Sequence, residues 1–196
     1  MLGSFLKDIK VILGSQSPRR KELLASLDID FAVVIKSIDE TIPKTIKSIE
    51  SAEYVAIKKL NAFDATEYKN YILITADTVV VDVDNNILGK PSSKEEAIEV
   101  LKSLSGSTHV VLTGVAIRYN EVIKSFTDKT VVKFEDLEEE EINYYVDKYQ
   151  PYDKAGAYGI QEWIGRIAVS YIEGSYENVM GLPTVRLYQA IREIVK

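Results

Sequence analysis

The sequence predicts an α/β protein built on a mixed, twisted β-sheet flanked by helices. Short apolar strands alternate with helices in the first part of the chain, whereas in the middle apolar strands follow one another across short turns. Alternation favours parallel strands and tight turns favour antiparallel hairpins, so both pairings are expected in one sheet. With 196 residues, of which 46% are hydrophobic, the chain can bury a sizeable core. We expect a single domain spanning 1–196. This domain could consist of two lobes with a cleft between them.

The first elements are predicted to be a strand, a loop and a helix. A short apolar run at 9–13 reads as a strand, and Ser17 followed by Pro18 is a typical start of a helix, with serine as the N-cap and proline in the first turn. A second strand is expected at 31–35. The apolar spacing at 51–63 then predicts a helix.

The middle of the chain is predicted to contain hairpins. A run rich in β-branched residues at 71–83 indicates a buried strand, followed by a turn at 84–86 into a short strand at 87–88. A helix is expected at 93–104, with Ser93 and Glu96 as a capping box.

The remaining elements follow from the same patterns. They are long strands at 109–119 and 122–134, an acidic helix at 137–149, a strand at 166–172 and a closing amphipathic helix at 183–195.

Composition excludes several classes of protein. The formal charge of -6 argues against a broad basic surface for nucleic acid, so no stable nucleic-acid complex is expected. The absence of cysteine excludes disulfides, thiolate metal sites and a cysteine nucleophile. No apolar run reaches membrane-spanning length, and residues 1–10 do not resemble an export signal, so we expect no membrane partner and a cytoplasmic protein.

The start of the first helix indicates an anion site. Arg19 and Arg20 lie in a first turn where the helix dipole is already positive, which costs stability unless an anion is bound there. Ser15 and Ser17 add hydroxyls, the helix end adds amide groups, and the guanidiniums add forked donors, which together suit a phosphate. The alternative is a surface helix whose arginines lie over neighbouring side chains.

Carboxylates and lysines supply the other candidates for chemistry. Asp77 lies within an apolar strand, where an ionised acid is tolerated only if it is paired, protonated or bound to a metal, although a structural aspartate at a strand end is the alternative. Glu40 follows the second strand and could equally be a solvated loop acid. Lys59 and Lys90 could hold phosphate as point charges, or be ordinary surface lysines.

The segment 153–161 contains small residues and glycines that permit close backbone approach, and Gln161 can recognise an amide or carbonyl edge. A tight bend between elements is the alternative. His109 is the sole histidine, so a histidine-based triad is excluded and a structural role is expected for it.

Several separated motifs together resemble the Maf family of nucleoside triphosphate pyrophosphatases. They occur in the family's order over almost the whole chain, at 15–24, 76–80, 88–91, 104–106, 113–115, 153–161 and 174–183. The chain departs from the family pattern at Gln16, where a small residue is usual, at Glu162, where glycine is common, and after Lys59, where alanine is usual.

The resemblance implies a Maf/ITPase-like fold and a cytoplasmic, metal-dependent hydrolase, often homodimeric, that cuts a nucleotide between its α and β phosphates. Its motifs look like the branch that acts on dTTP and UTP, with Arg19, Thr78 and Gln161 at the positions that distinguish it. It also implies that Asp77 is the general base and Glu40 a second acid. Lys59 and Lys90 would then face the triphosphate.

We expect Mg²⁺ or Mn²⁺ as cofactor, held by the hard oxygen ligands of Glu40 and Asp77 together with phosphate. Either acid could orient or deprotonate the water that attacks the α phosphorus, while Arg19 and Arg20 hold the leaving pyrophosphate with the two lysines. Such an enzyme would remove dTTP, UTP or modified pyrimidine nucleotides from the nucleotide pool. The alternative is a regulatory protein that binds a nucleotide without significant turnover, in keeping with the family's link to septum formation and cell-division arrest.

Overall fold

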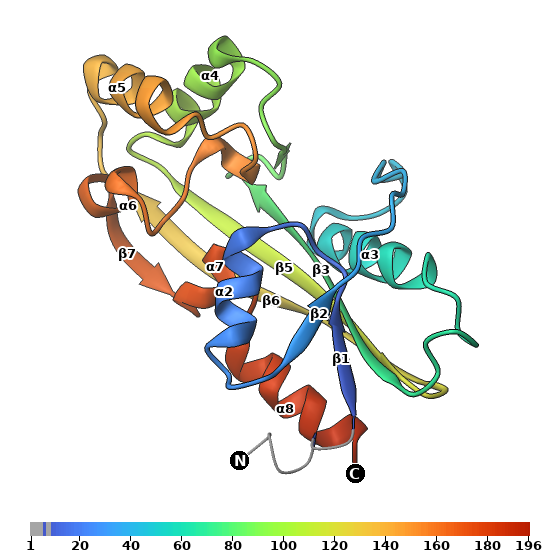
Figure 1. Ribbon diagram of the computed structural model, residues 1–196. Coiled ribbons are helices and arrows are strands. Elements are labelled where there is room, and N and C mark those ends of the chain that lie inside the picture. Colours follow the sequence, from blue (N-terminus) through green and yellow to red (C-terminus); the bar gives the residue numbers. More distant parts are fainter. Residues whose placement is uncertain (1–5, 7–8) are drawn as a thin grey trace. The chain divides into compact units, whose positions relative to one another are not determined.

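The computed structural model describes Leu6 and residues 9–196 of the chain (Figure 1). Within this part, one sheet has seven strands in the order β2-β1-β3-β5-β6-β7, and β4 pairs with β3. The strands are β1 (Lys10–Leu13), β2 (Phe31–Val33), β3 (Tyr71–Val81), β4 (Ile87–Leu88), β5 (Thr108–Tyr119), β6 (Val122–Phe134) and β7 (Val169–Glu173). The helices are α2 (Pro18–Ala25), α3 (Ser48–Asn61), α4 (Lys94–Leu104), α5 (Glu139–Tyr149), α6 (Trp163–Ala168), α7 (Tyr176–Met180) and α8 (Thr184–Ile194), with a 3₁₀ turn η1 (Ala155–Ala157).

The chain forms two compact units, and it passes between them within β3, β5 and β6 and again directly after α7. Unit 1 contains residues 1–77, 113–128 and 181–196. Unit 2 contains residues 78–112 and 129–180.

Unit 1 is organised around parallel strands. β1 pairs in parallel with β2, with Val11 opposite Phe31, and with β3, with Val11 opposite Ile72. Figure 1 shows these three strands side by side. Apolar side chains of β1 and β3 pack against α3 in a core that includes Ile12, Leu73 and Leu60. This packing fixes where the last turn of α3 lies against β3.

Two contacts bring α3 close to the sheet in unit 1. The Thr75 hydroxyl on β3 donates a hydrogen bond of 2.8 Å to the Ala56 carbonyl of α3. Gly114 on β5 lies so close that a Cβ there would be 2.2 Å from backbone atoms of Ala52 and Glu53. Only a residue without a side chain permits this approach of helix to strand.

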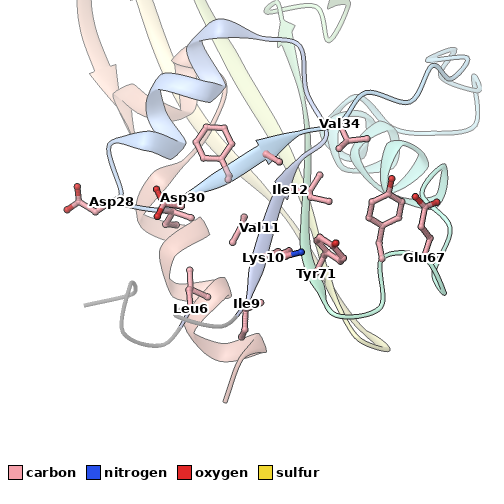
Figure 2. Close-up of a pocket in the computed structure, with 14 residues that line it drawn as sticks. Leu6, Ile9, Lys10, Val11, Ile12, Asp28, Asp30, Val34, Glu67 and Tyr71 are labelled. Atoms are coloured by element: carbon pink, nitrogen blue, oxygen red, sulfur yellow. The ribbon is translucent and has the colours of Figure 1, made fainter.

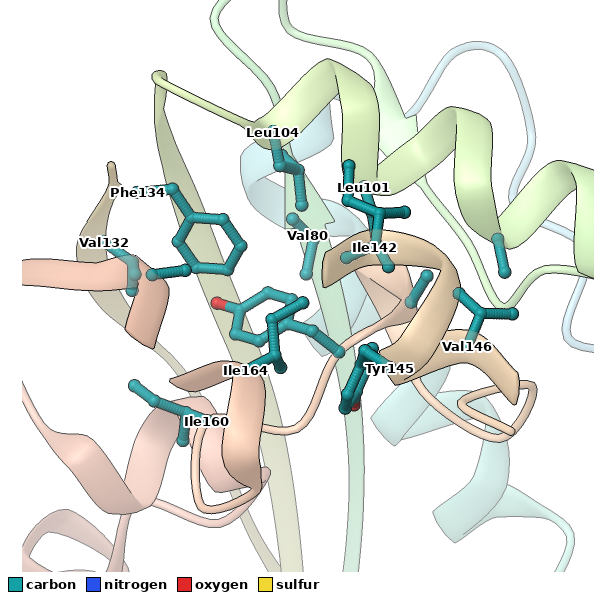
Figure 3. Close-up of a cluster of buried hydrophobic side chains, with 14 of the residues drawn as sticks. Val80, Leu101, Leu104, Val132, Phe134, Ile142, Tyr145, Val146, Ile160 and Ile164 are labelled. Atoms are coloured by element: carbon teal, nitrogen blue, oxygen red, sulfur yellow. The ribbon is translucent and has the colours of Figure 1, made fainter. Parts of the chain in front are cut away.

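Unit 2 has antiparallel pairing and a larger core. β4 pairs antiparallel with β3, and β7 pairs antiparallel with β6, with an irregular register at Lys133 and Phe134. Figure 3 shows the apolar core of this unit, to which α4, α5 and α6 contribute. His109 is 1% exposed and shares a hydrogen bond of 2.7 Å with the Tyr158 hydroxyl. The histidine is therefore part of the packed interior of unit 2, in keeping with the structural role expected for it.

The mixed sheet flanked by helices confirms the predicted fold class, and most elements lie where the pattern placed them. Ser17 is the N-cap of α2 and Ser93 that of α4, each accepting a hydrogen bond from the amide three residues on. The second half of that capping box is shifted, because the Glu96 carboxylate accepts from the Ser92 amide instead. α3 begins at Ser48, three residues before the predicted start.

The strand predicted at 166–172 is partly wrong. Residues Trp163–Ala168 form α6, and β7 begins only at Val169. Ile164 and Ala168 are both buried at a spacing of four, which lets one helical face pack into the core of unit 2. The short helix α7 carried no periodic signal long enough to predict.

No helix in the described part of the chain is both long and apolar enough to cross a membrane. Residues 1–5, 7 and 8, which bear on the expectation of no export signal, lie outside the described residues.

Replacing Gly114 with alanine should destabilise unit 1 by about 3 kcal/mol, because the added methyl group meets the backbone of α3 and cannot be absorbed by a flexible side chain. The matched control is Gly89→Ala, since a Cβ at Gly89 would meet nothing within 4 Å. Denaturant unfolding measures both variants. Equal free energies of unfolding would show that the close approach of α3 to β5 is wrong.

Stability should also depend on pH through His109. Burial lowers the pKa of His109 to about 4, whereas an unfolded histidine binds a proton below about 6.5. Between these values the unfolded state holds more protons, so this residue's contribution to stability is complete above pH 6.5 and falls by about 1.4 kcal/mol per pH unit on acidification toward pH 4. An NMR titration of this sole histidine is expected to show a neutral ring at pH 5.5. A midpoint near 6.5 would contradict the packing described.

Candidate active site

A tight connection joins β1 to the first helix of unit 1. The Gly14 amide donates a hydrogen bond of 2.8 Å to the Ile74 carbonyl of β3. A Cβ at Gly14 would lie 2.8 Å from Thr75 Cγ2 and 3.1 Å from the Phe63 ring, so glycine is needed for this approach. The chain then turns into α2 directly beyond the end of the central parallel strands, which is where ligands bind in sheets of this kind.

Ser15, Ser17 and Arg20 form a hydrogen-bonded group at the start of α2. The Ser17 hydroxyl accepts from the Arg20 amide at 3.4 Å, and the Ser15 hydroxyl accepts from the Ser17 amide at 3.3 Å. Arg20 Nη1 also donates to the Ser15 hydroxyl at 3.2 Å. The serines therefore order the first turn and the guanidinium as one group, beside the half-buried Arg19.

The Arg20 guanidinium is fixed from a second direction, because its Nε donates a hydrogen bond of 2.7 Å to the Gly181 carbonyl. Burial lowers the pKa of Arg20, while the charges of Asp77 and Glu40 raise it and that of Arg19 lowers it further. A guanidinium stays ionised under such shifts. The charges that act on Arg20 therefore include both carboxylates of unit 1.

Asp77, Lys59 and Glu40 form an ion cluster. Lys59 Nζ lies 2.7 Å from Asp77 Oδ1 and 3.1 Å from Glu40 Oε1. The Asp77 and Lys59 side chains are 13% and 14% exposed, whereas that of Glu40 is 48% exposed. Of the three states in which an acid is tolerated within an apolar strand, namely paired, protonated or metal-bound, the structure shows the first, because Asp77 is paired with Lys59.

The neighbouring acid Asp39 behaves differently from Glu40. Its carboxylate accepts hydrogen bonds from the Thr41 hydroxyl and amide, which lower the pKa of Asp39, and it lies 3.4 Å from Lys58 Nζ. Asp39 is thus used within its own exposed turn. Glu40 alone of this acidic pair is directed to the cluster with Lys59 and Asp77.

The other predicted site residues, Thr78, Lys90 and Gln161, belong to unit 2. Lys90 is exposed in the loop after β4, and the preceding Gly89 carbonyl accepts a hydrogen bond of 3.1 Å from the Gly156 amide. This contact joins the Lys90 loop to the segment that carries Gln161. The Gln161 Oε1 atom is buried and has no hydrogen-bond partner among the described residues.

The donor set suits a hard divalent cation. Asp77 and Glu40 place carboxylate oxygens around one ammonium group, so a positive charge already occupies the space between them. Mg²⁺ is commonly held by one or two carboxylates, with substrate phosphates and water completing its coordination. Within the described residues no group of three or more acidic, histidine or cysteine ligands occurs, so a cation here would depend on phosphate oxygens.

A pocket of about 840 Å³ lies elsewhere in unit 1 and contains none of the predicted site residues. Figure 2 shows it beside β1 and β2, with Lys10 over the ring of Tyr71 at 5.5 Å from the ring centroid. None of the residues predicted to hold phosphate or a cation therefore lies in this pocket.

Some contributors could not be found from the sequence. Gly181 supplies a backbone carbonyl to Arg20, and a backbone contact between residues so distant in the chain leaves no sequence signal. Tyr145 on α5 accepts a hydrogen bond from the Gly159 amide, just before Gln161. The sequence of α5 shows only an amphipathic helix and gives no sign of this contact. Glu162 stands out in the sequence as a departure from the family pattern, but its contacts with Tyr145 and Lys154 do not.

Comparison with solved structures finds a protein of the same fold. The structure of the Staphylococcus aureus Ham1 protein is similar with a TM-score of 0.53 and 18% identity, over 95% of this chain and 100% of that one. The likeness shows a shared fold, in agreement with the predicted Maf/ITPase-like architecture.

The family follows from sequence comparison. The model of the family described as Maf-like protein matches residues 10–194, and the chain belongs to this family. A protein of Flavobacterium johnsoniae is 46% identical, over 100% of both chains; one of Bacteroides thetaiotaomicron is 48% identical, over 99% of this chain and 100% of that protein. One of Parabacteroides distasonis is 50% identical, over 95% and 97%. All three are named dTTP/UTP pyrophosphatase.

Proposed function

We propose that this chain is a nucleoside triphosphate pyrophosphatase that hydrolyses dTTP and UTP, and modified pyrimidine nucleotides of the same type, to the monophosphate and pyrophosphate. The observation that carries the proposal is the meeting of Asp77, Glu40 and Lys59 in one ion cluster that also acts electrostatically on Arg20. The names of the relatives support the same reaction and the same substrates.

The start of α2 binds the triphosphate tail. Ser15 and Ser17 order the first turn, so that Arg20, together with Arg19, presents forked donors to phosphate oxygens without a large entropic cost. Lys59 and Lys90 add point charges. As the bond between the α and β phosphates breaks, these cations stabilise the negative charge that develops on the leaving pyrophosphate.

The carboxylates activate water for attack on the α phosphorus. Asp77 is the general base: it orients the water and accepts its proton as the new oxygen–phosphorus bond forms and the bridging oxygen departs with pyrophosphate. Glu40, the more exposed acid, completes the cluster. Together with Asp77 it would provide the carboxylate ligands of the cation. Mg²⁺ or Mn²⁺, when bound, supplies Lewis-acid polarisation of the phosphoryl oxygens.

Gln161 and Thr78 select the base. Uracil and thymine present an N–H group between two carbonyl groups, and the amide of Gln161 can accept from this N–H and donate to a carbonyl.

We place the reaction in the cytoplasm, in a homodimer that clears unwanted nucleotides from the pool and forms no stable nucleic-acid complex.

Pyrophosphate release from a panel of nucleoside triphosphates with Mn²⁺ tests the proposed activity. Turnover is expected to be highest for dTTP and UTP. It is expected to be lost on addition of EDTA, because EDTA removes the cation that polarises the phosphoryl oxygens. Tight binding of UTP without turnover would instead favour the regulatory alternative.

Asp77→Asn should fold and lose turnover by a factor of at least about 10³, because the amide cannot accept a proton and is a poor cation ligand. Asp147→Asn is a matched control, since that acid lies on α5 and pairs with Lys94 outside the cluster. Steady-state kinetics on folded protein measure both variants. Near wild-type turnover in Asp77→Asn would refute the assignment of the base.

A further inference from the structure

A glutamine side chain alone does not distinguish uracil from cytosine. In one orientation its oxygen accepts from the ring N–H of uracil or thymine; turned over, its NH₂ group donates to the ring nitrogen of cytosine while its oxygen accepts from the exocyclic amino group. Preference for dTTP and UTP therefore requires that the orientation of the Gln161 amide be held. The buried, unpartnered Gln161 Oε1 is the atom whose direction must be fixed.

Tyr145 fastens the backbone just before Gln161. Its hydroxyl accepts a hydrogen bond of 3.0 Å from the Gly159 amide and donates to the Glu162 carboxylate. Burial first, and then the Glu162 carboxylate, raises the pKa of Tyr145. The phenol thus remains a donor throughout the working pH range, and one hydroxyl joins the residues on both sides of Ile160 and Gln161.

Lys154 holds the other oxygen of the same carboxylate. Its Nζ lies 3.2 Å from Glu162 Oε1 and 2.7 Å from Asp153 Oδ1, and its side chain is only 9% exposed. A half-buried carboxylate that is engaged at both oxygens is confined to one position. Figure 3 shows Tyr145 within the apolar core of unit 2, among Ile142 and Val146, so the network is anchored in rigid packing.

Glu162 and Gln161 close over Gly159. A Cβ at Gly159 would lie 2.8 Å from Glu162 Cδ and 3.1 Å from Gln161 Nε2. The carboxylate and the NH₂ end of the amide therefore pack on the same glycine. A carboxylate packed on the same glycine favours the orientation in which NH₂ is nearer to it, which leaves Oε1 as the buried acceptor that still needs a donor.

We infer that Tyr145, Glu162 and Lys154 are positioning residues that hold the Gln161 amide in one orientation and thereby set the preference for uracil and thymine over cytosine. The inference rests on the proposed function and adds residues outside the binding contacts themselves. Glu162 stands where the family commonly has glycine, so the carboxylate of this network is a departure of this chain from the family pattern.

The test compares Tyr145→Phe with Tyr144→Phe. Both lose one hydroxyl from α5, but Tyr144 is 45% exposed and its hydroxyl bonds only to Lys148 among the contacts described. Dissociation constants for UTP and for CTP are measured by calorimetry in EDTA, so that binding is read without turnover, and kcat and KM are measured separately with Mn²⁺. Thermal unfolding monitors the fold of each variant.

In Tyr145→Phe the preference for UTP over CTP is expected to fall about tenfold, with weaker UTP binding and a higher KM but a kcat close to that of the wild type. Tyr144→Phe should keep the wild-type preference. If Tyr145→Phe does not fold, Glu162→Gln, which keeps the shape and removes the charge, is judged by the same loss of preference.

An unchanged ratio of the two constants in the folded variant overturns the positioning role, as does an equal loss in Tyr144→Phe. In either case UTP and dTTP turnover by the wild type would leave the proposed function intact. Absence of UTP binding and turnover in the wild type would instead overturn the proposed function itself, and the inference with it.

Discussion

The arrangement of the candidate site depends on the ion cluster of Asp77, Lys59 and Glu40. A carboxylate within an apolar strand is stable only when a partner compensates its loss of water, and Lys59 at 2.7 Å is that partner. The lysine reaches Asp77 because α3 is docked tightly on the sheet, through the Thr75 hydroxyl and the bare backbone of Gly114. The packing of α3 in unit 1 therefore also provides the charge that compensates Asp77.

The same cluster accounts for the charges at the start of α2. Two arginines in a first turn oppose the helix dipole, and the carboxylates of Asp77 and Glu40 partly offset the charge of Arg20. Serine hydroxyls and the Gly181 carbonyl then fix where that guanidinium lies. The outcome is a group of cations and anions that offset one another's charge, and this is the group that we propose as the triphosphate site.

Local sequence signals predicted much of the fold. The features that depend on contacts between residues distant in the chain could not be predicted. The Ser17 cap and the long strands follow from patterns of a few residues, so the fold class and the start of α2 could be predicted. That Asp77 needs a partner was also predictable from its apolar neighbours, but that the partner is Lys59 depends on how α3 docks. The strand predicted at 166–172 was partly wrong because an apolar stretch that short suits a helix or a strand equally well. The bonds of Tyr145 across unit 2 leave no sequence pattern at all.

A double-mutant cycle on Lys59 and Asp77 measures how strongly the two charges depend on each other. Free energies of unfolding are measured for Lys59→Met, Asp77→Asn and the double variant. Lys59→Met should cost about 3 kcal/mol, because it leaves Asp77 charged and without its partner, and the double variant should be more stable than the sum of the single effects predicts by at least about 1 kcal/mol. Strictly additive effects would mean that the two charges do not depend on each other and that Lys59 does not compensate the burial of Asp77.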